Sequence, residues 1–402
     1  MTVALARWTW LFPARLPPRK ATTEGATAVE FGIFIQNYVP NFRRDNEPDA
    51  EHHVIMDELE IVIAADKAGF KYGWLPEHHF LDEYSHLSAN DVVAGYLAHA
   101  TKRLHIGSGI FNPLPQVNHP AKLAERVAML DHISEGRFEF GTGRGAGSHE
   151  ILGFLPGIES TSGTREIWED VIAEFPKMWM QDEYEGYQGK FWSLPPRKVL
   201  PKPWKKPHPP MWYACGNVAS YEMCARRGLG VLGFSVGDLN DMAPIVDTYK
   251  KNIGNAEPIG AFVNDNIMIT TAGFVDEDGK KARKSMLDAK LNYLQSNVFR
   301  YHDTFPHPEA VPYWPELIPD FDADTAEYMI NIGAVICGDP DEALAQCQRW
   351  ASSGADQLVF GTGCATKEQT LHMIELMGKH VIPKIDTDPV HRTTHMRDAW
   401  KG

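Results

Sequence analysis

The chain has no long apolar run, no basic excess and no closely paired cysteines. None of its apolar stretches is long enough for a transmembrane helix, so we expect no contact with a membrane core. Lys and Arg number 39 against 53 Asp and Glu, and the net charge of -14 opposes binding to nucleic acid or an anionic membrane. The five cysteines are scattered without a C-x-x-C pair, which predicts reduced cytoplasmic thiols rather than disulfides or a zinc site.

Residues 1–29 differ in composition from the rest of the chain. Four basic residues precede the first acidic one, and three prolines interrupt any helix. The apolar run is too short and interrupted for a secretory signal. We expect a poorly ordered N-terminal extension, or an arm that packs on a neighbouring subunit.

From residue 30 onward, short apolar runs alternate with helical patterns. The predicted strands are 31–35, 71–75, 104–108, 137–141, 211–214, 231–234, 266–271 and 357–361. Strands that alternate with helices favour a parallel sheet, and eight of them predict a (β/α)₈ TIM barrel over residues 30–385. We expect insertions after the fourth and seventh strands and a C-terminal tail at 386–402. An open doubly wound sheet, split into two domains, is the alternative.

A carboxylate and two imidazoles follow the second predicted strand, at Glu77, His78 and His79. In a barrel, chemistry gathers at the C-terminal ends of the strands, so this segment is a candidate for proton transfer or for holding a polar ligand. The alternative for a single histidine is a structural role in the interior. A metal-dependent hydrolase is a second alternative, although adjacent residues in an extended turn point in different directions.

A glycine-rich stretch, 141–147, follows the fourth strand and carries Arg144. It fits a dinucleotide fingerprint only loosely, because no helix starts at once and an arginine stands in the turn. Arg144, Arg165 and the start of the helix at 218–227 instead suggest a direct phosphate site, with Asn217 and Ser220 at the helix N-terminus. The alternatives are a solvated Arg144 and an Asn217 that only caps its helix.

Two further segments suggest a flat ligand and a cover for it. The third strand ends in glycines on both sides of Ser108, with Ile110 directly after Gly109. Without a side chain at Gly109, a flat ring could lie across the strand ends. A simple bulge is the alternative. The long insertion at 299–324 is rich in aromatic residues and is a candidate lid. The segment 360–363 repeats the Phe-Gly-Thr-Gly of 140–143 and is a competing candidate site.

Taken in order, several motifs resemble those of the bacterial luciferase-like flavin-dependent monooxygenases. They are Glu77-His78-His79-Phe80, Asn118-His119-Pro120, the run 130–138 that ends in Ser134-Glu135-Gly136-Arg137-Phe138, and Gly143-Arg144-Gly145. The resemblance covers residues 30–233 and resumes at 338. It implies a barrel that binds reduced FMN and O2, receives its flavin from a separate flavin reductase, and commonly forms a homodimer.

The resemblance also implies roles for single residues. His78 matches the catalytic histidine, with Glu77 beside it. Arg144 and Arg165 match the phosphate-binding arginines.

Other carried-over roles concern the contacts to the flavin. Asn217 and Ser220 align with the hydroxyl-bearing phosphate contacts, with Asn in place of the first Ser. Glu150 stands where a luciferase has an Asp near the flavin ring, and Gly109-Ile110 falls near a non-proline cis peptide.

Two departures from the family leave light emission and long-chain aldehyde specificity unsupported. Gly143 replaces the luciferase cysteine beside the flavin, and 299–324 has no match. We therefore predict an FMN-dependent monooxygenase that inserts one oxygen atom into a small apolar organic substrate through a flavin C4a peroxide. A deazaflavin-dependent hydride-transfer enzyme, which usually carries Asp at the position of Glu77, and a flavin-binding barrel without catalysis are the alternatives.

Overall fold

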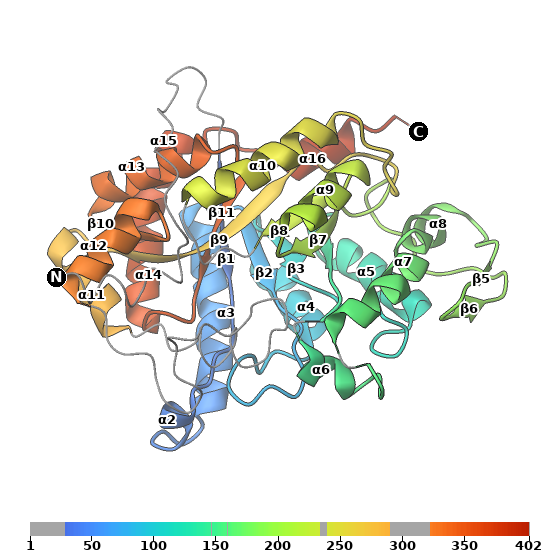
Figure 1. Ribbon diagram of the computed structural model, residues 1–402, viewed down its shortest axis with the longest axis horizontal. Coiled ribbons are helices and arrows are strands. Elements are labelled where there is room, and N and C mark those ends of the chain that lie inside the picture. Colours follow the sequence, from blue (N-terminus) through green and yellow to red (C-terminus); the bar gives the residue numbers. More distant parts are fainter. Residues whose placement is uncertain (1–28, 146, 159, 234–238, 290–321, 402) are drawn as a thin grey trace.

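The computed structural model describes residues 29–145, 147–158, 160–233, 239–289 and 322–401 (Figure 1). The predicted N-terminal extension, apart from residue 29, and the aromatic part of the predicted lid, 299–321, lie outside the described residues. None of the described helices is long and apolar enough to cross a membrane.

Eight parallel strands close into a barrel, which confirms the predicted fold and rules out the open sheet. The strands pair in the order β1, β2, β3, β4, β7, β8, β9, β11 and back to β1. Their bounds are β1 Glu30–Phe34, β2 Tyr72–Leu75, β3 His105–Ser108, β4 Phe138–Thr142, β7 Met211–Cys215, β8 Gly230–Gly233, β9 Ile267–Val275 and β11 Gln357–Gly361. Strand residues are mostly buried because helices cover the outside of the barrel and side chains fill its inside.

The seventh barrel strand, β9, is longer than the pattern predicted. Its second half continues past residue 271 and pairs with an extra parallel strand, β10 (Val335–Gly338), which we did not predict. Gly273 interrupts the apolar pattern of this segment, so the sequence predicted that the strand ends at residue 271. β10 is only four residues long, but all four are buried against β9 and the neighbouring helices.

Helices flank the strands on the outside of the barrel (Figure 1). The longer ones are α3 Ala50–Ala68, α4 Asn90–Ala100, α5 Pro120–Ile133, α9 Val218–Arg226, α10 Leu239–Ile253, α11 Gly279–Asp288, α12 Ala323–Ile332, α13 Pro340–Ala351 and α14 Lys367–Leu376. Residues 165–180 form two helices, α7 Arg165–Ile172 and α8 Glu174–Met180, separated at Ala173. Pro176 lies in the first turn of α8, where a missing N–H costs no helical hydrogen bond.

The insertion after β4 extends beside the barrel. It contains α6 (Ser148–Leu152), a 3₁₀ turn (Thr161–Thr164), α7, α8 and a small antiparallel hairpin, β5 (Tyr187–Gln188) with β6 (Ser193–Leu194). The hairpin lies at the far edge of the molecule from the N-terminal strands (Figure 1). α6 and α7 lie nearer the barrel and contribute to the site described below.

Residues 386–402, which the sequence analysis set apart as a tail, include the helix α16 (Arg392–Asp398). Arg397 on this helix is only 2% exposed and forms paired hydrogen bonds with Asp131, at 2.9 and 3.0 Å. Thr393 is buried and donates to Glu139 Oε1 at 2.6 Å. The chain end is thus packed against the N-terminal end of the barrel.

Candidate active site

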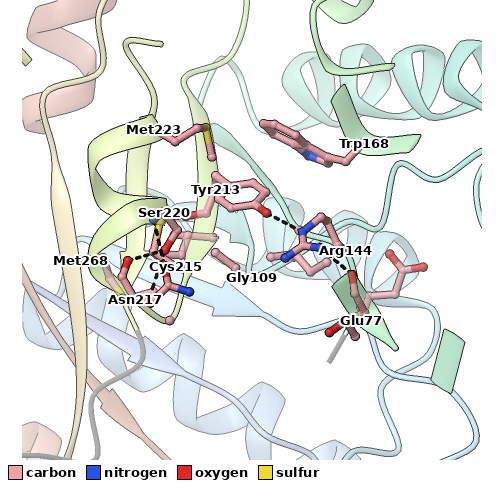
Figure 2. Close-up of a pocket in the computed structure, with 18 of the residues that line it drawn as sticks. Glu77, Gly109, Arg144, Trp168, Tyr213, Cys215, Asn217, Ser220, Met223 and Met268 are labelled. Atoms are coloured by element: carbon pink, nitrogen blue, oxygen red, sulfur yellow. Dashed lines mark hydrogen bonds between the residues drawn. The ribbon is translucent and has the colours of Figure 1, made fainter. Parts of the chain in front are cut away.

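A cavity of about 260 Å³ opens at the C-terminal ends of the barrel strands (Figure 2). Eight of the ten predicted site residues line it: Glu77, His78, Gly109, Ile110, Arg144, Arg165, Asn217 and Ser220. Ser108 and Glu150 do not. The fold therefore brings residues from four separate β-α connections together in one cavity.

His78 is held by a buried carboxylate. Its Nδ1 lies 3.2 Å from Glu150 Oε2, and the two side chains are 11% and 1% exposed. An ionised carboxylate only accepts hydrogen bonds, so Nδ1 carries the proton and Nε2 is left for the cavity. Glu150, which the resemblance placed near the flavin ring, contacts the histidine in this structure.

Glu77 is the centre of a second polar cluster. Its carboxylate accepts hydrogen bonds from the Asn112 backbone N–H at 2.8 Å and from Asn118 Nδ2 at 2.9 Å, and lies 3.1 Å from His79 Nε2. Burial acts to lower the pKa of His79, but the hydrogen bond and charge of Glu77, with a contribution from Glu150, raise it overall.

The two histidines thus have different carboxylate partners. Among the described residues, Glu77, His78 and His79 do not bring three ligand atoms together, so the structure gives the metal-hydrolase alternative no support.

Two arginines, Arg144 and Arg165, also line the cavity. Arg144 Nε donates to Tyr213 Oη at 2.7 Å, and its Nη1 donates to the Thr161 carbonyl at 2.5 Å (Figure 2). These bonds fix the guanidinium in the cavity wall. Arg165 begins α7, and its guanidinium makes no hydrogen bond or ion pair with any residue that the structure describes. Its charge is therefore available to an anion.

The N-terminus of α9 also lines the cavity, through Asn217 and Ser220. Asn217 Oδ1 accepts from the Ser220 N–H at 3.0 Å, and Ser220 Oγ lies 3.2 Å from the Asn217 N–H, which is a capping box. Figure 2 shows Asn217 and Ser220 on the far side of the cavity from Glu77. Asn217 therefore caps α9 in this structure, and the exposed N-terminus of the helix directs its positive end at the cavity.

The end of β3 differs in part from the prediction. Ser108 is buried away from the cavity, where its Oγ donates to the Gly141 carbonyl at 2.8 Å and accepts from the Gly141 N–H at 2.9 Å. The predicted cis peptide near Gly109-Ile110 is wrong: among the described residues, the non-proline cis bond joins Tyr84 to Ser85. A side chain at Gly109 would lie 2.8 Å from the ring of Phe34, which is why the position is a glycine.

The polar groups of the repeated segment 360–363 form hydrogen bonds with other parts of the protein. Thr362 Oγ1 donates to Glu58 Oε1 at 2.5 Å, and the Gly363 N–H donates to Gln36 Oε1 at 3.1 Å. Burial raises the pKa of Glu58 to about 7, against the lowering effect of its hydrogen bonds. These hydrogen bonds occupy the Thr362 hydroxyl and the Gly363 N–H within the protein, so the structure gives the competing site at 360–363 no support.

Several residues that line the cavity were not predicted from the sequence. Tyr84, Trp168 and Tyr213 contribute aromatic surface, and Met223 and Met268 contribute sulfur-bearing apolar surface. The Trp168 ring lies 4.5 Å from the Tyr213 ring, above Arg144 in Figure 2. Tyr213 lies within a strand and Trp168 within a helix, so nothing in the local pattern distinguished either from an ordinary core residue.

The geometry can be compared with known proteins. A family model described as "Luciferase-like monooxygenase" matches residues 29–357. The chain belongs to this family.

Similar family members include proteins with different substrates and cofactors. The oxygenase component of flavin-dependent trigonelline monooxygenase from Acinetobacter baylyi is 29% identical over 204 residues, which are 50% of this chain and 53% of that protein. The chain therefore matches little more than half the length of this relative.

Two solved structures share the fold. The FMN complex of the oxygenating constituent of 3,6-diketocamphane monooxygenase from Pseudomonas putida has a TM-score of 0.69 at 18% identity, covering 89% of this chain and 99% of that one. An F420-dependent secondary alcohol dehydrogenase has a TM-score of 0.63 at 17% identity, with the same coverage. At these identities, the likeness establishes the fold.

Proposed function

We propose that this luciferase-like protein is an FMN-dependent monooxygenase that uses reduced FMN and O2 to insert one oxygen atom into a small apolar organic substrate. The observation that carries the proposal is the polarity of the cavity. The same cavity is lined by two arginines, Arg144 and Arg165, and by His78, whose Nδ1 is paired with Glu150. A cofactor with a phosphate at one end and a reactive ring at the other fits this arrangement.

The two arginines suit a phosphate monoester. Two guanidinium groups and the N-terminus of α9 supply N–H donors and positive charge, and Arg165 has no partner among the described residues to displace. In this proposal Arg144, Arg165, Asn217 and Ser220 hold the phosphate, and Gly109 and Ile110 lie beneath the ring. The bound reduced flavin would supply the electrons that activate O2.

The protein's own contribution is placement, proton control and exclusion of water. His78 Nε2 would hold or deliver a proton at the reacting end, while Glu150 fixes the imidazole through Nδ1. Phe34, Leu232 and Met268 line the cavity and reduce its access to water. The same apolar lining favours an apolar substrate.

The proposal is tested by comparing cofactors directly. Under anaerobic conditions, reduced FMN and reduced F420, a deazaflavin, are each titrated into the wild-type protein and Arg144→Met. We expect FMN to bind the wild type more tightly, and Arg144→Met to weaken its binding. Tighter binding of F420 would instead favour the deazaflavin-dependent hydride-transfer alternative, while bound FMN without substrate-coupled O2 use would favour a non-catalytic flavin carrier.

Two partners belong to the proposal. A separate flavin reductase would supply reduced FMN, as the name "oxygenase component" implies for the Acinetobacter relative. A homodimer is supported by exposed apolar residues on the neighbouring helices α4 and α5: Val92 is 71% exposed, Tyr96 51% and Met129 49%. A monomer in sedimentation analysis would contradict the dimer without affecting the cofactor proposal.

A further inference from the structure

Tyr84 lies beside the catalytic candidate His78 and carries an unused hydroxyl. The residue is 5% exposed and lines the cavity, and its ring centroid is 5.0 Å from that of His78. Its Oη makes no hydrogen bond to any residue that the structure describes. The hydroxyl is not fully enclosed either, so it is open to the cavity.

The other groups on this part of the wall do not offer a comparable donor. Phe34, Ile110 and Met268 are apolar. His78 donates through Nδ1 to Glu150, which leaves Nε2 as an acceptor while the ring is neutral. Thr270 already directs its hydroxyl towards the Gly233 carbonyl, at 3.4 Å.

Tyr84 also remains a donor over the working pH range of most enzymes. Burial raises the pKa of its phenol, and the negative charges of Glu58 and Glu150 raise it further. The hydroxyl therefore stays protonated. An unpaired, largely buried donor is costly unless a ligand satisfies it.

We propose that Tyr84 donates a hydrogen bond to an oxygen atom of the substrate, so that the substrate is an apolar ketone or aldehyde and not a pure hydrocarbon. This inference rests on the proposed function, because it places the substrate beside His78 at the reacting end of the cavity. The apolar wall would bind the carbon skeleton, and Tyr84 would fix the carbonyl. A site built around a donor disfavours a ligand of the same shape that lacks the acceptor.

The test compares two ligands of nearly equal shape, cyclohexanone and methylenecyclohexane, by ligand-observed NMR titration of the FMN-loaded protein. The measured quantity is the ratio of the dissociation constant of the alkene to that of the ketone, in the wild type and in Tyr84→Phe. Taking the change in this ratio cancels the intrinsic difference in hydrophobicity between the ligands. Tyr96→Phe, on the exposed face of α4, is the matched control.

We expect Tyr84→Phe to lower the ratio by roughly 2- to 12-fold, as loss of one hydrogen bond implies, while Tyr96→Phe leaves it unchanged. FMN affinity is measured on the same samples and should be equal in all three proteins. An unchanged ratio in Tyr84→Phe, or no detectable ketone binding, would overturn the assignment. Loss of FMN affinity in Tyr84→Phe without loss of ketone selectivity would assign the hydroxyl to the cofactor.

Failure of the proposed function gives a different result. If the wild type does not bind FMN, the cofactor proposal fails, and the same ligand pair is titrated into the protein without flavin. A ketone preference that depends on Tyr84 would then still support the hydrogen bond, and its absence would overturn that as well.

Discussion

At the N-terminal end of the barrel, which we call the closed end, charged side chains are buried and paired. At the C-terminal end, the open end, the side chains of Arg165 and Tyr84 line a cavity and make no hydrogen bond with the described residues. Lys71 Nζ lies 2.8 Å from Glu30 Oε1 at the closed end, and Arg397 pairs with Asp131. The same strands supply both ends. The difference shows that one end stabilises the fold and the other leaves hydrogen-bonding capacity for ligands.

The largest expected effect is a loss of stability when a buried ion pair at the closed end is removed. Arg397→Met leaves the buried carboxylate of Asp131 without its partner and should lower the free energy of unfolding by about 3–5 kcal/mol. Urea unfolding measures the change. Arg226→Met, which removes an exposed pair with Glu222, is the control and should cost less than about 1 kcal/mol. Equal losses in the two variants would mean that the closed end is not specially stabilising.

At the open end, removal of His78 should change reactivity and not binding. With His78→Ala, we expect bound reduced FMN to be reoxidised by O2 faster than in the wild type, because the reacting end of the cavity loses the group that holds a proton there. The dissociation constant of FMN should be unchanged. Stopped-flow absorbance gives the rate, with the exposed His132→Asn as control. A reoxidation rate equal to that of the wild type would remove His78 from the mechanism.

Arg165 is the counterpart of Arg397 at the open end. Because it makes no ion pair with the described residues, Arg165→Met should leave the free energy of unfolding unchanged. It should weaken FMN binding by about 10- to 100-fold, through loss of a charged hydrogen bond to the phosphate. Fluorescence titration and urea unfolding of the same sample measure both. A loss of stability without a loss of affinity would place Arg165 in the fold and not in the site.

The smallest expected effect distinguishes two roles of Asn217, helix capping and contact with the ligand. Asn217→Ala and Thr366→Ala each remove the N-cap residue of a capping box, on α9 and α14, and each should cost about 1 kcal/mol of stability. Only Asn217→Ala should also weaken FMN binding. If both variants bind FMN like the wild type, Asn217 is a cap alone.

The barrel could be predicted because each strand is a short buried run between turn signals, as at residues 31–35 and 357–361. β10 could not, since its four residues gain their strand conformation only by pairing with the extended β9. The role of α16 was also hidden: Thr393 and Arg397 appear in a polar segment, and only the folded chain shows that their partners, Glu139 and Asp131, lie more than 250 residues away.

The candidate site shows the same division. Residues just after strands, such as His78 and Arg144, could be placed at the cavity because strand ends converge in a barrel. Ser108 was misplaced because β3 turns its side chain towards β4, and alternation along a four-residue strand did not fix the face. Tyr84 lacked any signal, because an unpaired hydroxyl becomes visible only when its surroundings are known.

The most direct test of the account is the reaction of the bound cofactor with oxygen. The protein is mixed anaerobically with reduced FMN, and O2 is then added in a stopped-flow spectrometer. The account predicts that bound FMN is reoxidised more slowly than free FMN, because the cavity holds the ring away from water beside His78. Reoxidation at the rate of free FMN would contradict the proposed monooxygenase.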